Sequence, residues 1–191
     1  EAGRNILIAR STFKDAASVI GISESELYHR WGVVRERLLA ARGKRVRPSK
    51  DDKILTDWNG LMIAALARAA QALRRPEYAD AAARGADFIL NEMKNESDRL
   101  LHSYRQGALI SGCLDDYAFL VWGLIDLYEA QFDVKYLRAA VDLNRTMTEH
   151  FWDKDEAGLF FSPDDASDLP LREKAFHDGA IPSGNSVAML N

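Results

Sequence analysis

The sequence predicts an all-α fold, a partial (α/α) toroid of helical hairpins joined by short β-hairpin connections. Three observations predict it: two almost wholly apolar helical segments, an amphipathic segment after each, and a repeat of about 60 residues. A helix that is apolar on every side must be covered by others, whereas a helix with one apolar stripe lies at a surface. Alternation of the two kinds therefore predicts an inner ring of helices inside an outer ring. An open solenoid of helical pairs is the alternative.

The repeat is visible in the sequence itself. The apolar segments are LTDWNGLMIAALARAAQAL, from Leu55, and LDDYAFLVWGLIDLYEAQF, from Leu114; in both, an acidic residue precedes an aromatic one. The amphipathic segments that follow are PEYADAAARGADFILNEM and VKYLRAAVDLNRTMTEHF. After each pair comes a segment that we expect to be extended, RLLHSYRQG and then GLFFSPDD. A third unit begins at DGAIPSGNSVAMLN.

The N-terminal part of the chain does not follow this repeat. We expect residues 1–45 to form a helical segment and linker, and residues 46–191 to form the partial toroid. Ser23 and Glu26 have the spacing of a capping box, which predicts a helix start. Gly43 fits its C-terminal end. Apolar residues recur at helical spacing along one stripe of this helix: Leu27, Trp31, Val34 and Leu38. The earlier segment NILIA is interpreted as a short buried strand or an extended segment.

Composition limits the possible partners and compartments. Hydrophobic residues make up 47% of the chain and charged residues 28%, the balance of a globular protein. No apolar stretch approaches the roughly 20 residues that a membrane crossing needs, and no signal-peptide pattern is present. The single cysteine, Cys113, excludes an internal disulfide and favours a reducing compartment, so we expect a cytoplasmic location. The net charge of −4 argues against nucleic-acid binding, and the basic segment RGKRVRPSKDDK is interpreted as a solvated linker.

The candidate site lies where the inner helices begin. Short connections make neighbouring helices antiparallel, so the N-termini of all inner helices are expected at one rim. Asp57, Asp116 and Asp178 are the candidate catalytic residues, because a glycosidase needs two carboxyl groups roughly 5 to 9.5 Å apart. Asp115 and Asp116 cannot form such a pair, since adjacent residues on a helix point about 100° apart. A helix N-terminus favours the ionised carboxylate, so Asp178, in a loop, is the expected proton donor. A simple N-cap is the alternative for Asp115 and Asp116.

Other polar residues carry weaker signals. His102 and Arg105 are expected at the surface, with a place beside the rim as the alternative. Cys113 is interpreted as a packing residue, and a reactive thiol near a helix N-terminus is the alternative. Trp58 is a candidate platform for stacking on a sugar. The four histidines show no metal-ligand spacing, so the sequence predicts no metal and no cofactor.

Three segments resemble a known family: KDDKILTDWNGLMIAALARAA, GCLDDYAFLVWGLIDLYEA and DGAIPSGNSVAML. In this order they resemble the spermatogenesis-associated protein 20 family of thioredoxin-domain-containing proteins. The resemblance implies a middle part of a helical region similar to six-hairpin glycosidases and N-acylglucosamine 2-epimerase. The thioredoxin-like part of the family has no counterpart in these residues, so no redox role is implied for them. The matching motif positions imply a set of substrate-binding residues at the rim: Asp51, Asp52, Lys53, Trp58, Asn59, Asp115, Tyr117, Ser183, Asn185 and Ser186.

Two functions are compatible with these features. The first is binding of a sugar or related polyol at the rim, with hydrolysis or epimerisation by carboxylates from separate repeats. The second is a non-catalytic helical scaffold that serves an attached thioredoxin-like domain. The chain ends shortly after a third apolar helix begins, so we expect it to be part of a longer helical domain. The open edge of such a part is expected to self-associate.

Overall fold

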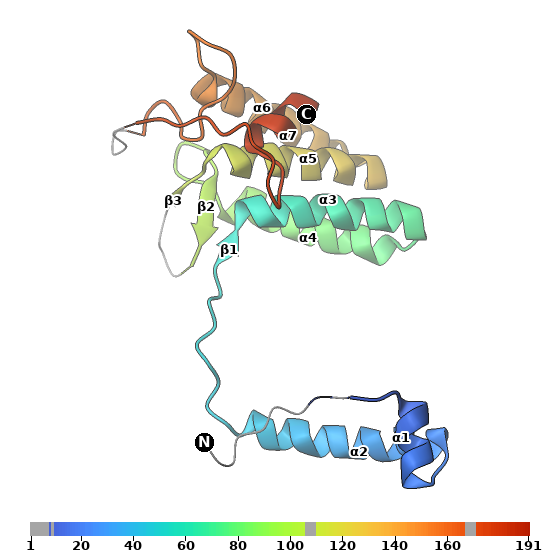
Figure 1. Cartoon of the computed structure of the whole chain (residues 1–191). Coiled ribbons are helices and arrows are strands. Elements are labelled where there is room, and N and C mark those ends of the chain that lie inside the picture. The colour runs from blue at the N-terminus through green and yellow to red at the C-terminus, as the bar shows by residue number, and fades with distance from the viewer. Residues whose placement is uncertain (1–7, 9, 106–109, 167–170) are drawn as a thin grey trace. The chain divides into compact units, whose positions relative to one another are not determined.

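The chain divides into two compact units, Glu1–Asp51 and Asp52–Asn191. A computed structural model describes residues 8, 10–105, 110–166 and 171–191 (Figure 1). The division follows Asp51, whereas the sequence places the boundary after residue 45. Over the described residues the elements are, in order, α1 (Phe13–Ile20), α2 (Glu24–Gly43), β1 (Ile54–Leu55), α3 (Thr56–Leu73), α4 (Pro76–Glu92), β2 (Leu101–Tyr104), β3 (Ile110–Ser111), α5 (Leu114–Gln131), α6 (Val134–Phe151) and α7 (Gly184–Leu190).

The N-terminal unit consists of α1 and α2. The hydroxyl of Ser23 accepts a hydrogen bond from the backbone N–H of Glu26 at 3.1 Å, which confirms the predicted helix start. The Glu26 carboxylate accepts from Nε of Arg30 at 2.7 Å, so it forms an ion pair along the helix. None of the residues of α2 is buried, and of its predicted apolar stripe Leu27 is half-buried while Trp31, Val34 and Leu38 are exposed. The segment NILIA lies largely outside the described residues.

The second unit contains the helical hairpins. In Figure 1, α3 and α5 lie side by side, α4 packs under α3, and α6 and α7 pack against α5. α4 begins with Pro76, whose missing N–H costs nothing in the first turn of a helix. The order of apolar inner helix and amphipathic outer helix thus occurs twice, as the repeat predicts. The all-α fold with short β connections is confirmed.

Glycines bring the two inner helices into close contact. A Cβ atom added to Gly60 of α3 would lie 2.6 Å from the backbone nitrogen of Leu120 and the backbone carbon of Phe119 in α5. A Cβ atom added to Gly123 of α5 would lie 2.6 Å from the carbonyl oxygen of Gly60. Backbone atoms cannot move aside as the end of a flexible side chain can, so this crossing requires residues without a side chain.

The two inner helices are not buried to the same extent. α5 is buried on nearly all sides, including Tyr117, Phe119 and Leu124, as its all-round apolar sequence predicts. α3 is buried only on the face towards α4 and α5, and Met62 and Leu73 on its other face are 56% and 60% exposed. Sequence reasoning expected cover on every side for both helices and an open edge for the partial toroid, and the exposed face of α3 agrees with the second expectation. Within the described residues, no helix combines the length and the apolar character that a bilayer crossing requires.

A small antiparallel sheet lies at the N-terminal ends of the inner helices. Its order is β1-β2-β3, with Ile54 opposite Tyr104 and Leu101 opposite Ser111. The predicted extended segment RLLHSYRQG supplies β2. The second such segment, GLFFSPDD, forms only one isolated bridge, between Trp152 and Leu159. Since β1 leads directly into α3, and β3 is followed by α5, the sheet holds both helix starts together.

Candidate functional site

Asp116 connects the two inner helices at their N-termini. Its carboxylate is fully buried. One oxygen accepts the backbone N–H of Asp57 at 2.9 Å, and the other accepts the backbone N–H of Cys113 at 2.8 Å. The first bond joins α5 to the first turn of α3, and the second completes a capping box at the start of α5. Both helices therefore begin at one rim, as the sequence predicts. No part of Asp116 reaches solvent, and its carboxylate bonds groups at the start of both helices.

His102 is the member of this cluster that the sequence signals most weakly. Its Nδ1 lies 3.1 Å from both carboxylate oxygens of Asp116. This hydrogen bond raises the pKa of His102, against the opposing effect of burial. Sequence reasoning favoured a surface role, and the side chain is in fact 30% exposed. Leu101 and Ser103, on either side of His102, are buried, and their strand pairs with the residues before α3. This alternation is the signal that would have placed His102 beside the start of α3.

Cys113 completes this cluster as the N-cap residue of α5. Its Sγ lies 3.2 Å from Oδ2 of Asp116. Burial raises the pKa of the Cys113 thiol, and the nearby carboxylate adds to the effect. The protonated thiol is therefore the favoured form. This outcome favours the packing interpretation over the reactive one, because the partial positive charge of the helix end is outweighed.

Asp57 and Asp115 stand beside Asp116 with raised pKa values. Burial is the main cause for both, and the Asp116 charge adds to it. The pKa of Asp115 reaches about 6, although the backbone N–H of Gly184 opposes the shift. The expectation that a helix N-terminus keeps these carboxylates ionised is therefore wrong in its direction. Loss of hydration and repulsion between like charges exceed the stabilisation from the helix end.

Asp178 has the opposite behaviour. It is exposed, and its carboxylate accepts the backbone N–H of Ser183 at 2.9 Å and the hydroxyl of Ser186 at 2.7 Å. These bonds lower the pKa of Asp178. Its ionised form is favoured, which is the reverse of what the predicted proton donor needs. The loop nevertheless brings it to the same rim, because Gly184, next to Ser183, contacts the carboxylate of Asp115.

Several of the predicted substrate-binding residues have hydrogen-bond partners within the chain. The hydroxyl of Tyr117 accepts the backbone N–H of Leu100 at 3.0 Å within the core. The amide of Asn185 bonds both the N–H and the carbonyl of Leu159, at 2.8 and 2.9 Å. Ser183 is likewise engaged, as the N-cap of α7. The polar groups of these three side chains therefore already bond within the chain.

The remaining predicted residues lie closer to solvent. Trp58 is 62% exposed and follows Asp57 in the chain. The amide of Asn59 donates to the carbonyl of Leu55 at 2.7 Å. Asp52 pairs with Arg105 at 2.9 Å. Asp51 and Lys53 are exposed on the segment before β1.

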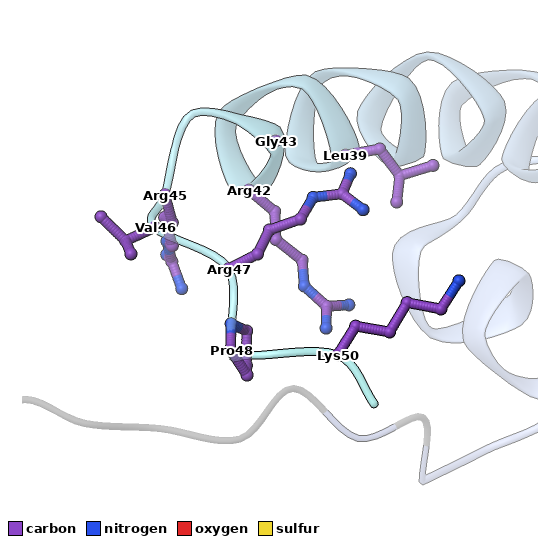
Figure 2. Close-up of a pocket in the computed structure, with 8 residues that line it drawn as sticks. All are labelled: Leu39, Arg42, Gly43, Arg45, Val46, Arg47, Pro48 and Lys50. Carbon is purple, nitrogen blue, oxygen red and sulfur yellow. The ribbon is translucent and has the colours of Figure 1, made fainter. Parts of the chain in front are cut away.

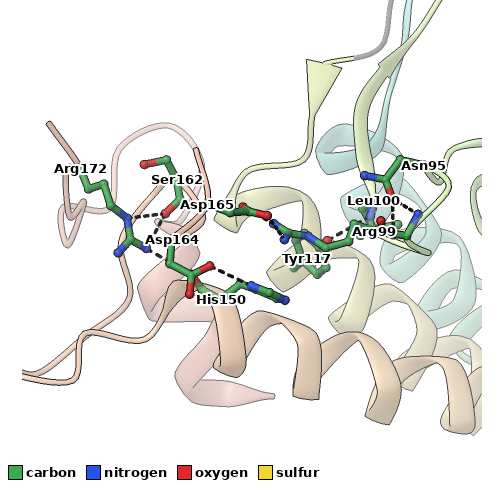
Figure 3. Close-up of polar contacts among 10 residues, drawn as sticks. Asn95, Arg99, Leu100, Tyr117, His150, Ser162, Asp164, Asp165 and Arg172 are labelled. Atoms are coloured by element: carbon green, nitrogen blue, oxygen red, sulfur yellow. Dashed lines mark hydrogen bonds and ion pairs between the residues drawn. The ribbon is translucent and has the colours of Figure 1, made fainter. Parts of the chain in front are cut away.

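A pocket of about 660 Å³ opens beside the cluster. His102 and Cys113 form part of its wall, together with the aromatic ring of Phe161. Arg99 and Asp165 also line it and form a bidentate ion pair (Figure 3). Nη1 and Nη2 of Arg99 donate to the two carboxylate oxygens of Asp165 at 2.7 and 3.2 Å. Sequence reasoning did not single out Arg99 or Phe161, because they become neighbours only when the two hairpin connections meet.

Two further contacts in Figure 3 hold the second connection in place. Nδ1 of His150 lies 2.8 Å from the carboxylate of Asp164, and the guanidinium of Arg172 donates to the carbonyl of Ser162 at 2.8 Å. The described residues 152–166 are thus held against the end of α6, although none of them belongs to a named strand.

The basic linker borders a separate hollow in the N-terminal unit. Arg42, Arg45, Arg47 and Lys50 line a volume of about 570 Å³ at the end of α2 (Figure 2). Its walls are exposed side chains of a single segment. The interpretation of the basic segment RGKRVRPSKDDK as a solvated linker stays a prediction.

The fold belongs to a class that also includes carbohydrate enzymes. Cellobiose 2-epimerase from Spirochaeta thermophila superposes with a TM-score of 0.55 at 19% identity, over 72% of this chain and 36% of that chain. A GH76 α-mannanase from Bacteroides thetaiotaomicron gives 0.51 at 22% identity, over 60% and 32%. The class of protein is therefore the (α/α) toroid, or six-hairpin glycosidase-like fold. At these identities the likeness concerns the fold alone.

The sequence relatives are more specific. Spermatogenesis-associated protein 20 of mouse is 34% identical over 200 residues, which is 99% of this chain and 25% of that protein, and the human protein gives the same values. An uncharacterized protein of Caenorhabditis elegans is 33% identical over 197 residues. Over this segment the chain belongs to the spermatogenesis-associated protein 20 family. It spans about a quarter of the length of these relatives. No protein-family model matches it.

Proposed function

We propose that this part of the protein binds a sugar or related polyol at the rim of the inner helices and takes part in its hydrolysis or epimerisation. The observation that carries the proposal is the convergence of carboxyl groups from separate repeats. Asp57 of α3 and Asp115 of α5 lie beside the buried Asp116, and the loop of Asp178 contacts Asp115 through Gly184. Carboxylates and an exposed aromatic ring are the usual components of a sugar site.

The proposed roles differ among the four carboxyl groups. Asp57 and Asp115 are the groups proposed to contact the substrate, and Asp178 is proposed to accept hydrogen bonds from its hydroxyls. Asp116 is proposed as a positioning residue, because its four contacts with the chain hold the other groups. Trp58, 62% exposed beside Asp57, is the proposed stacking surface. The fold neighbours that are named as mannanase and epimerase support a sugar as ligand, by analogy of fold.

A non-catalytic scaffold is the second candidate. It is favoured by the internal hydrogen bonds of Tyr117, Asn185 and Ser183, which a purely structural rim would also need. Its proposed partner is a substrate protein of an attached thioredoxin-like domain. A cytoplasmic location stays a prediction from the single cysteine.

The experiment that separates the two candidates is a sugar-library thermal-shift screen on the full-length protein. A ligand is expected to raise the Tm of the wild type and of Asp142→Asn, a control on the exposed face of α6. The same ligand is expected to lose most of its effect on Asp115→Asn. An equal shift for both variants, or no response to any sugar, would contradict the sugar site and favour the scaffold.

A further inference from the structure

The cluster beside the rim contains three different metal-ligand side chains. His102 comes from β2, Cys113 is the N-cap of α5, and Asp116 lies in the first turn of the same helix. One nitrogen, one sulfur and one carboxylate oxygen of these residues all lie within 4.8 Å of one another. The sequence spacing of histidines and cysteine gave no sign of this, because the hairpin between β2 and α5 brings His102 back over the helix start.

The distances in the cluster approach those of a tetrahedral zinc site. Zinc binds nitrogen and oxygen at roughly 2.0–2.2 Å and sulfur at about 2.3 Å, so two ligand atoms on one ion are separated by roughly 3.3–3.6 Å. Nδ1 of His102 lies 3.1 Å from the Asp116 carboxylate, and Sγ of Cys113 lies 3.2 Å from it. Protons now occupy these contacts. An ion in their place requires each of these two contacts to lengthen by only a few tenths of an ångström, and a ring nitrogen of His102 lies within 4.8 Å of Sγ of Cys113.

The surroundings also suit a bound cation. The Asp116 carboxylate is held by the backbone N–H groups of Asp57 and Cys113, and such outer contacts fix a ligand in place. The carboxyl groups of Asp57 and Asp115 lie close to Asp116. Of the charged groups that act on the pKa of His102, Asp116 and Asp57 raise it, and the cation Lys53 lowers it. Negative groups therefore outnumber positive ones around the cluster.

The cluster is open on one side. His102 and Cys113 both line the pocket of about 660 Å³, so a fourth coordination position faces a space that admits water or a ligand. Three protein ligands and one open position are the arrangement of catalytic rather than structural zinc sites.

We propose that His102, Cys113 and Asp116 bind one zinc ion through Nδ1, Sγ and a carboxylate oxygen. On binding, the thiol of Cys113 releases its proton to solvent and coordinates as thiolate. The imidazole of His102 carries its proton on Nε2, which leaves Nδ1 free to coordinate. The site goes beyond the proposed function, since its existence does not require that a sugar binds.

The test is a titration of the metal-free full-length protein with zinc chloride, followed by calorimetry, and with cobalt chloride, followed by absorption. One zinc ion per chain is expected, and cobalt is expected to give the near-ultraviolet band of a thiolate ligand. Loss of an outer contact typically weakens metal binding 10- to 100-fold, so loss of a ligand in Cys113→Ser or His102→Gln should weaken it by more than about 100-fold.

His150→Gln is the matched control. His150 forms the same kind of contact with a carboxylate, that of Asp164 at 2.8 Å, but has no thiol beside it. This variant should bind zinc as the wild type does, and circular dichroism should show that all three variants are folded. Absence of stoichiometric zinc binding would overturn the proposal, as would equal affinity in Cys113→Ser. Neither result bears on the sugar screen, which uses no added metal.

Discussion

The crossing of the inner helices predicts a reversal of the usual effect of a glycine-to-alanine change. In an exposed helix, alanine in place of glycine stabilises by about 1 kcal/mol. In Gly60→Ala the new methyl group would lie 2.6 Å from two backbone atoms of α5. Overpacking of this kind costs about 3 kcal/mol when the contacted atoms cannot move aside. The net destabilisation is therefore about 2 kcal/mol, which corresponds to a Tm lower by roughly 4–8 °C for a protein of this size.

Two other glycines provide the controls. A Cβ atom on Gly85 of α4 would meet only the Ile63 side chain, at 3.7 Å, and one on Gly32 of α2 would meet nothing within 4 Å. Gly85→Ala and Gly32→Ala are expected to leave stability unchanged or raise it by about 0.5–1 kcal/mol. The assay is urea and thermal unfolding followed by circular dichroism. If Gly60→Ala is as stable as Gly85→Ala, then α3 and α5 are not in the contact that places Asp57 on the Asp116 carboxylate.

Three further outcomes follow from named contacts. The ion pair with Lys174 lowers the pKa of Asp153 to about 2, below its unfolded value, so the stabilisation is present above pH 4 and is lost as the pH falls towards 2. The difference in urea midpoint between wild type and Asp153→Asn should therefore shrink over this range, and a constant difference would contradict the assignment. Tyr117→Phe should cost about 1–3 kcal/mol in urea unfolding, because the buried N–H of Leu100 loses its acceptor; a neutral effect would mean that water replaces the hydroxyl. The chain itself is expected to self-associate through the exposed face of α3. Met62→Glu should therefore shift it towards monomer in sedimentation velocity. An unchanged distribution of species would show that this face is not the contact.

Local chemistry decided much of what the sequence could predict. The Ser23 cap, the starts of α3 and α5, and the alternation of apolar and amphipathic helices depend on neighbours a few residues apart. The parallel course of α3 and α5 follows from the same pattern, because short connections leave few ways to arrange hairpins. For this reason the common rim of Asp57 and Asp116 was predictable.

The chemical state of the rim residues was not predictable in this way. Whether a carboxylate at a helix start stays ionised depends on how much water it loses and on which charges surround it. The pKa of Asp115 is raised to about 6 because this carboxyl group is half-buried beside Asp116. The pKa of Asp178 is lowered because this carboxylate is exposed and accepts hydrogen bonds from two donors. Their sequence contexts do not contain that difference.

The amino-acid sequence by itself determined the class of fold, the family and the rim at which the inner helices begin, because periodicity and capping act over short distances along the chain. Only the tertiary structure decided which side chains face one another. In the tertiary structure Asp116 is buried, and Nδ1 of His102, on β2, lies within hydrogen-bond distance of its carboxylate. One face of α3 is exposed. The physical reason is that these outcomes depend on distances between segments far apart in sequence, which pattern alone does not encode.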